Sequence, residues 1–167
     1  MPNTTARAPR SRLAILTLVV TAGLWWIYFW PPHHESIGGL RQSIRYGYGH
    51  YVIFAAAAAF SAGVEVEIDV LTGESSLGAV AASLCVTVPV AIFMLATWWI
   101  TMRPYADGLV NTVMPLGALL VLVDPLIPVP FAITSIIIVG VVAVLVLRPP
   151  MERSERKKTA ARVPGAS

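Results

Sequence analysis

The sequence predicts an all-α protein, a polytopic bundle of about five membrane-spanning helices, and three observations support this. First, 56% of the 167 residues are hydrophobic and only 13% are charged, whereas a soluble domain carries roughly 25% charged residues. Second, the mean hydropathy is +0.72. Third, nine of the twelve Lys and Arg residues lie at 7–12 and 148–162. The middle of the chain therefore consists of nearly uncharged blocks.

These blocks predict five helices in order, over about residues 12–31, 48–71, 77–102, 106–124 and 126–148. Each is close to the roughly 20 apolar residues that a helix needs to cross the hydrocarbon core. The second block is weaker because it is alanine-rich and ends in acidic residues. The fourth is weaker because it contains Asn111 and Pro115. Helices are favoured over strands because unpaired backbone groups are costly in lipid, and the blocks lack the alternation of a membrane barrel.

The first and third helices end in similar stretches, WWIYFWP and WWITMRP. Tryptophan favours the lipid–water boundary, where its ring is apolar and its N–H stays hydrated. Pro31 and Pro104 favour helix ends because the residue before a proline is pushed out of the α region. Since alternate helices run the same way, both clusters should lie on one face of the membrane. The predicted interface anchors are Trp25, Trp26, Trp30, Trp98 and Trp99.

The second helix carries the candidate polar site, His50 near its start and Glu65 near its end. An acidic residue near lipid depth suggests a proton or cation site. Glu65 is the deepest of three acids and shares a face with Asp69, whereas Glu67 should point elsewhere. His50 and Glu65 are about 22 Å apart along one helix, so they cannot touch within it. The alternative is that all three acids lie in the headgroup zone at a helix terminus.

Small residues in the second helix, Ala55, Ala59 and Gly63, predict a helix-packing seam, because four-residue spacing lets another helix approach closely. In the third helix, Pro89 removes the usual donor to the carbonyl of Cys85. The Cys85 thiol itself is expected to be buried and inert.

The predicted domains are a basic N-terminal tail over 1–11, a transmembrane domain over 12–148 and a basic disordered tail over 149–167. The longest connection, 31–49, is either an ordinary loop or contains a short helix at the lipid surface, with apolar residues such as Ile44 at helical spacing. Asp124, directly before a proline, is interpreted as a turn residue.

The distribution of basic residues predicts the orientation. With five crossings, nine Lys and Arg residues lie on one side and three on the other, so the positive-inside rule places the N-terminus outside and the C-terminus inside. Arg7, Arg10 and Arg12 argue the opposite, because they resemble the flank of a signal anchor. Four crossings would reconcile the two if residues 106–130 were re-entrant.

No nucleophile–base pattern, phosphate loop or zinc signature occurs in the sequence. His33, His34 and Glu35 are adjacent in a loop and give no ligand geometry by themselves. We therefore predict no enzyme activity, no metal and no cofactor. The basic tails fit a membrane protein better than a nucleic-acid-binding one. The predicted partners are the lipid bilayer and either a second copy of the chain or another membrane protein.

Three stretches in order, WWIYF at 25–29, YGHY at 48–51 and AGVE at 62–65, resemble the bacterial low temperature requirement A (LtrA) family of polytopic membrane proteins. The resemblance is good over about 20–75 and continues as a match in hydropathy to 148. His50 and Glu65 match the family's polar positions, whereas Trp30 stands where an acidic or polar residue is expected. Family members are usually more than twice this long, so the resemblance implies their C-terminal part only.

The resemblance implies a protein of the bacterial plasma membrane. The first hypothesis is a non-enzymatic membrane assembly or low-temperature stress-adaptation module. The alternative is a small oligomeric transporter or proton-coupled carrier that uses Glu65, with His50 supplied by a neighbouring subunit. The position of Glu65 discriminates between them, because a carrier needs it inside the bundle and facing a polar partner.

Overall fold

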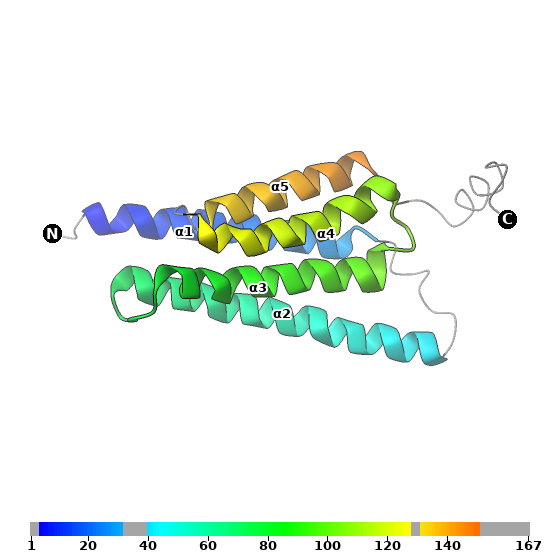
Figure 1. Ribbon diagram of the computed structural model, residues 1–167, viewed down its shortest axis with the longest axis horizontal. Coiled ribbons are helices and arrows are strands. Elements are labelled where there is room, and N and C mark those ends of the chain that lie inside the picture. The colour runs from blue at the N-terminus through cyan, green and yellow to red at the C-terminus, as the bar shows by residue number, and fades with distance from the viewer. Residues whose placement is uncertain (1–3, 32–39, 128–130, 151–167) are drawn as a thin grey trace.

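The computed structural model describes residues 4–31, 40–127 and 131–150. Within these ranges the regular structure is entirely helical, which confirms the all-α prediction (Figure 1). The α-helices are α1 (Thr4–Phe29), α2 (Leu40–Thr72), α3 (Ala79–Thr97), α4 (Gly108–Val123) and α5 (Ala132–Leu147). A π-helix, η2 (Trp98–Met102), continues α3, and a 3₁₀-helix, η3 (Asp124–Leu126), continues α4.

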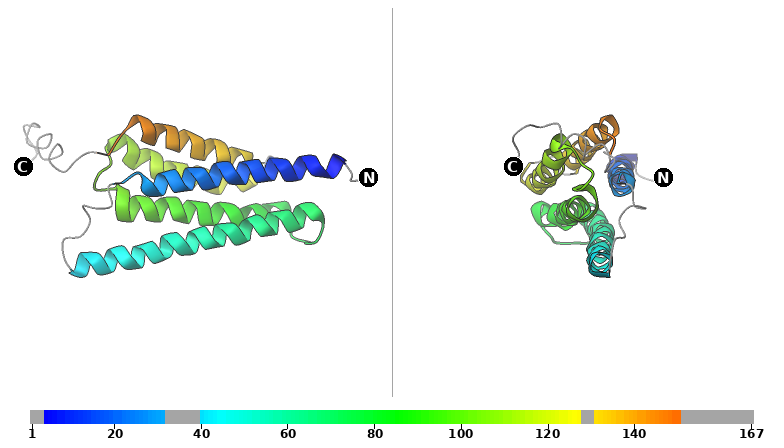
Figure 2. Two further views of the ribbon diagram at one scale, coloured as in Figure 1. Left: turned by 180° about the vertical axis from the view of Figure 1, so that it is seen from behind. Right: turned by 90° about the vertical axis from the view of Figure 1, so that its right-hand side faces the viewer.

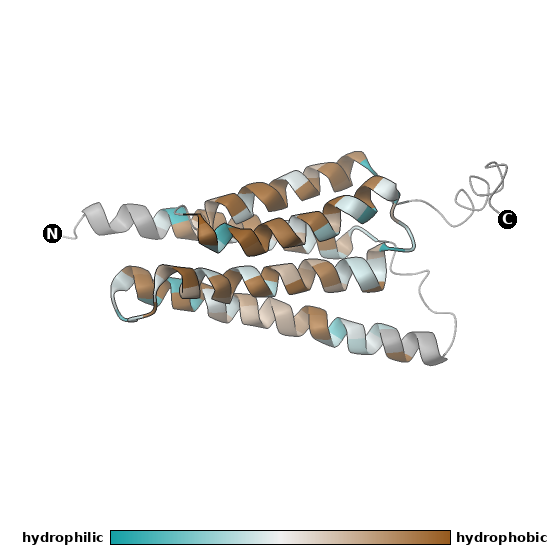
Figure 3. Cartoon of the chain, viewed as in Figure 1, coloured by the Kyte–Doolittle hydropathy of each residue, from teal (hydrophilic) through white to brown (hydrophobic). Residues whose placement is uncertain are grey.

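Four helical segments of the described chain are long and apolar enough to cross a membrane: Ser11–Phe29, Tyr46–Thr72, Ala79–Met102 and Gly108–Leu126. Hydrophobic residues cover the middle of the helices on the visible face of the bundle (Figure 3). Helix α5 has 16 residues and rises roughly 24 Å, less than the roughly 30 Å of a hydrocarbon core. Helix α4 is continuous through Pro115, without the break in the helix that a re-entrant segment over 106–130 would contain.

Helices α1, α3 and α5 run in one direction, and α2 and α4 run in the other (Figures 1 and 2). The end of the bundle that carries Trp30, Trp98 and Trp99 is called the tryptophan end. The end that carries Glu65, Glu67 and the α2–α3 turn is called the glutamate end. Helix α1 begins at the glutamate end and α5 finishes at the tryptophan end, which is the arrangement expected for five antiparallel segments.

Two helix starts differ from the prediction. Helix α1 begins at Thr4, so residues 4–11 of the expected N-terminal tail are helical. Helix α2 begins at Leu40, so the expected surface helix is not a separate element but the first turns of α2. No proline interrupts α2 between Leu40 and Thr72, whereas α1 continues through Pro9. The predicted tail over 149–167 lies almost wholly outside the described residues.

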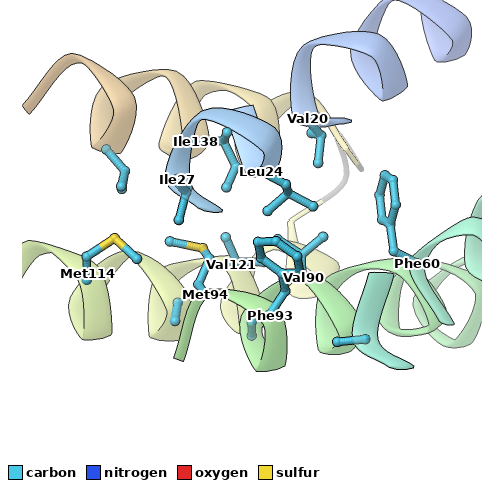
Figure 4. Packing of buried hydrophobic residues seen from close by; sticks show 14 of the residues in the cluster. Val20, Leu24, Ile27, Phe60, Val90, Phe93, Met94, Met114, Val121 and Ile138 are labelled. Atoms are coloured by element: carbon cyan, nitrogen blue, oxygen red, sulfur yellow. The ribbon is translucent and has the colours of Figure 1, made fainter. Parts of the chain in front are cut away.

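The core is formed by apolar side chains from all five helices (Figure 4). Val20, Leu24 and Ile27 of α1 face Val90 and Met94 of α3 across the bundle. Met114 and Val121 of α4 and Ile138 of α5 complete this cluster. In lipid, packing of this kind is the main source of helix association, because lipid tails are as apolar as the side chains.

Gly63 lies in close contact with the backbone of α3. A Cβ atom at Gly63 would lie 2.1 Å from the backbone oxygen of Cys85, which is the carbonyl that Pro89 deprives of its helical donor. The missing side chain thus lets the α2 backbone approach a carbonyl that lacks its usual helical donor.

The other two residues of the predicted seam do not face α3. Ala55 and Ala59 are exposed on the bundle surface, whereas Ala56 is buried. Residues four apart drift by about 40° per step around a helix, so three such residues do not share one contact line. The prediction of a single seam is therefore wrong within the chain. Cys85 is also exposed, not buried as expected, because α2 covers its backbone and not its thiol.

Candidate functional site

His50 lies at the tryptophan end, half-buried among aromatic rings. Its Nδ1 atom is 2.8 Å from the carbonyl oxygen of Tyr46, one turn earlier in α2. Its ring lies 4.1 Å from the ring of Tyr46 and 5.9 Å from that of Tyr28 on α1 (centroid distances). These contacts give His50 a packing role between α1 and α2.

Glu65, the predicted interior carboxylate, is exposed on the bundle surface at the opposite end. The structure therefore does not bring His50 and Glu65 together. The carrier hypothesis required Glu65 to lie inside the bundle facing a polar partner, and the structure does not place it there. The buried face of α2 runs through Ile53, Ala56, Phe60 and Gly63 at alternating spacings of three and four. The next position in that pattern is Glu67.

Glu67 is the carboxylate that enters the bundle, with only 8% of its surface exposed. It points to a different side of α2 from Glu65, as expected. That side is the bundle face, because Glu67 lies one turn beyond Gly63. Its Oε1 atom has no hydrogen-bond partner among the described residues.

Asp124 is 1% exposed. The sequence suggested only a turn residue, but its carboxylate also accepts hydrogen bonds from another element. Its Oδ2 atom accepts hydrogen bonds from the Thr134 hydroxyl and, at 3.1 Å, from the Thr134 backbone N–H. These bonds join the end of α4 to the start of α5. Its Oδ1 atom has no partner within the part of the chain that the structure describes.

Two hydroxyl groups of α3, those of Ser83 and Thr87, are also buried, one turn apart along the helix. Met94 contacts Gly117 across the α3–α4 boundary. Because these helices are antiparallel, seven residues, or about two turns, from each bring Thr87 level with Asp124. The α2–α3 contact between Gly63 and Cys85 places Ser83 level with Glu65 and Thr87 level with Ser61, so Glu67 lies roughly 9 Å along the axis from the level of Thr87. We call Glu67, Ser83, Thr87 and Asp124 the buried polar cluster.

The sequence did not reveal this cluster because it depends on contacts between distant elements. The three–four spacing from Ile53 to Glu67 was a usable signal for Glu67. No local pattern identifies Asp124, since its burial requires η3 to pack against α3 and α5.

The five predicted anchors lie together at the tryptophan end, as expected. Trp25, Trp26 and Trp99 are exposed (59%, 45% and 52%), and the Arg103 guanidinium lies 4.5 Å above the Trp99 ring. Trp30 and Trp98 also hold helices together. Their Nε1 groups donate to the carbonyl oxygen of Leu145 at 2.9 Å and to Oδ1 of Asn111 at 3.0 Å, respectively.

No group of three His, Cys, Asp or Glu side chains gathers anywhere in the described ranges. His33, His34 and Glu35 lie outside them. The buried polar cluster offers oxygen atoms alone, two carboxylates and two hydroxyls. Such a set accepts protons or hard cations and suits neither soft metals nor anions.

A comparison with protein families matches residues 3–147 to the family described as "Bacterial low temperature requirement A protein (LtrA)". The match includes all five helices and the buried polar cluster, and it extends well beyond the 20–75 stretch on which the residue-level resemblance rests. No curated protein and no solved structure matches the chain.

Proposed function

Because the chain belongs to the bacterial low temperature requirement A (LtrA) family, we propose that it is a non-enzymatic, multi-pass protein of a bacterial plasma membrane that supports growth at low temperature. The single observation that carries this proposal is the family match over all five helices. The family description supplies the link to low temperature, and the four long apolar segments supply the link to a membrane.

The outer surface supports a lipid environment. Large apolar side chains are exposed on every helix, among them Leu18 (68%), Phe54 (59%), Leu119 (57%) and Ile136 (70%). A surface this apolar would drive aggregation in water but is solvated by lipid tails. The exposed tryptophans at one end then fit the headgroup boundary.

The proposal includes a protein partner, either a second copy of the chain or another membrane protein. Ala55 and Ala59 support it, since both are exposed one turn apart on α2 and leave room for a helix from outside the chain. The proposal includes no nucleic-acid partner and no catalysed reaction, because the sequence holds no nucleophile–base pattern.

Growth of a deletion strain tests the proposal. Loss of the gene should slow growth at low temperature and leave growth at the optimum unchanged, and the wild-type gene should restore it. A variant with Ala55→Leu and Ala59→Leu should reach the membrane but restore growth poorly if a partner contacts this face. Equal growth of the deletion and parent strains at both temperatures would contradict the proposed role.

A further inference from the structure

An apolar groove runs along the last turns of α3 and along η2 at the tryptophan end. It has a volume of about 450 Å³ and is lined by Ile92, Leu95, Ala96, Trp98, Trp99 and Ile100. Ile92 and Trp99 are exposed, so the groove opens on the outside of the bundle. Every lining side chain is aliphatic or aromatic, which suits the groove to a hydrocarbon chain.

Arg103 lies beside the two tryptophan rings of this groove. Its guanidinium carbon is 4.5 Å from the ring centroid of Trp99 and 5.7 Å from that of Trp98. The Trp98 ring is fixed in turn, because its Nε1 group donates to Oδ1 of Asn111 on α4. The rings of Trp98 and Trp99 pack edge to face, 5.8 Å apart. These contacts hold the guanidinium next to the groove.

The positive charge of Arg103 is not balanced by any carboxylate in the part of the chain that the structure describes. The ion pair at this end joins Arg148 to Asp107, 3.4 Å apart, so the carboxylate of Asp107 is already paired. Arg103 is exposed and carries five N–H donors in a planar fork. These donors are therefore available to an anion from outside the chain.

Helix α2 brings a second arginine position to the same level. A Cβ atom at Gly49 would lie 2.6 Å from Cδ1 of Ile100, so these two residues meet. Because α2 and α3 are antiparallel, Arg45, one turn before Gly49, lies about level with Arg103, which follows Ile100 by nearly one turn. Positive charge is thus concentrated beside the tryptophans, at the depth where lipid phosphates lie.

We propose that this groove binds one anionic phospholipid, with its phosphate at the Arg103 guanidinium and an acyl chain along the apolar lining. The planar guanidinium fork matches the geometry of phosphate oxygens. An anionic lipid is favoured over a zwitterionic one, because the described carboxylate at this end, Asp107, is paired with Arg148 and is not free to hold a headgroup ammonium. The proposal rests on the membrane location of the chain and not on its role at low temperature.

Native mass spectrometry of the full chain in detergent tests this proposal. The protein is mixed with equal amounts of phosphatidylglycerol and phosphatidylcholine that carry identical acyl chains. The wild type should retain one phosphatidylglycerol with a preference of about fivefold or more, which is the usual contribution of one basic residue near a lipid surface. Arg103→Gln should remove most of this preference. Arg12→Gln makes the same change at an exposed arginine of the glutamate end and should leave the preference unchanged.

A second variant tests the acyl chain without changing any charge. Ala96→Leu fills the groove and should lower the retention of both lipids several-fold, whereas Ala62→Leu, at an exposed alanine of α2, should not. Glycerol phosphate in excess should fail to displace the lipid, because it has no acyl chain to bury.

The proposal is overturned if the two lipids are retained equally, or if Arg103→Gln or Ala96→Leu behaves as the wild type does. It is also overturned if glycerol phosphate displaces the lipid completely, since the site then binds a phosphate alone. Finally, it is overturned if the wild type retains no lipid, which is the result expected if a second copy of the chain covers the groove.

Discussion

Glu65 and Glu67 are two residues apart, and this small separation decides which of them enters the bundle. Two steps turn a helix by about 200°, so the two carboxylates point to nearly opposite sides of α2. The bundle side is fixed by Gly63, whose backbone contacts that of Cys85. The sequence predicts that the two carboxylates face different sides of α2, but it does not predict which side meets the bundle.

At the residue scale, Thr134 should be important for stability. Thr134→Val removes the hydroxyl that donates to buried Asp124 and preserves the side-chain shape. We expect the free energy of unfolding to fall by about 1–3 kcal/mol, because a buried acceptor loses a donor. The matched control is Thr112→Val, since Thr112 is exposed and its hydroxyl donates only to the carbonyl of Gly108 in its own helix. Unfolding in mixed micelles measures the free energy of unfolding of both variants. If Thr134→Val and Thr112→Val lower it equally, the role given to Thr134 is contradicted.

At the element scale, hydropathy predicts where the helices are but not which faces meet. The number and order of the five helices follow from uncharged blocks and prolines, as does the gathering of the tryptophans at one end. The close approach at Gly63, the exposure of Cys85 and the π-helix after Thr97 arise from contacts between α2 and α3 or within the last turns of α3. Contacts between two helices leave no periodic pattern in the sequence of either helix alone. For this reason the sequence does not predict these three features.

Substitution of the glycines tests the helix contacts directly. Gly63→Ala places a methyl group 2.1 Å from the Cys85 oxygen, and backbone cannot move aside as a flexible side chain can. We expect the free energy of unfolding to fall by about 1–3 kcal/mol, which is the usual cost of adding atoms to a closely packed contact. Gly140→Ala in α5 meets nothing within 4 Å and should leave stability unchanged. The midpoint of thermal unfolding in detergent is compared between the Gly63→Ala and Gly140→Ala variants. An unchanged midpoint for Gly63→Ala would contradict the close α2–α3 contact.

At the scale of the whole molecule, the direction of the helices links the charge distribution to the orientation of the bundle in the membrane. Since α1 begins at the glutamate end and α5 finishes at the tryptophan end (Figure 2), Arg41, Arg45 and Arg103 lie on the tryptophan side, and Arg148 follows α5 at the same end. The positive-inside rule then predicts that this side faces the cytoplasm. The glutamate end would then face the outside.

Labelling of single cysteines tests this orientation. In a background with Cys85→Ser, cysteines are introduced at Glu74 in the α2–α3 turn and at Pro149 after α5, both exposed positions at opposite ends of the bundle. A membrane-impermeant maleimide should label the Glu74→Cys protein in intact cells and the Pro149→Cys protein only after the membrane is opened. The reverse pattern would show that Arg7, Arg10 and Arg12 set the orientation instead. Labelling of both positions in intact cells would contradict the spanning bundle itself, because two ends separated by a hydrocarbon core cannot share one aqueous side.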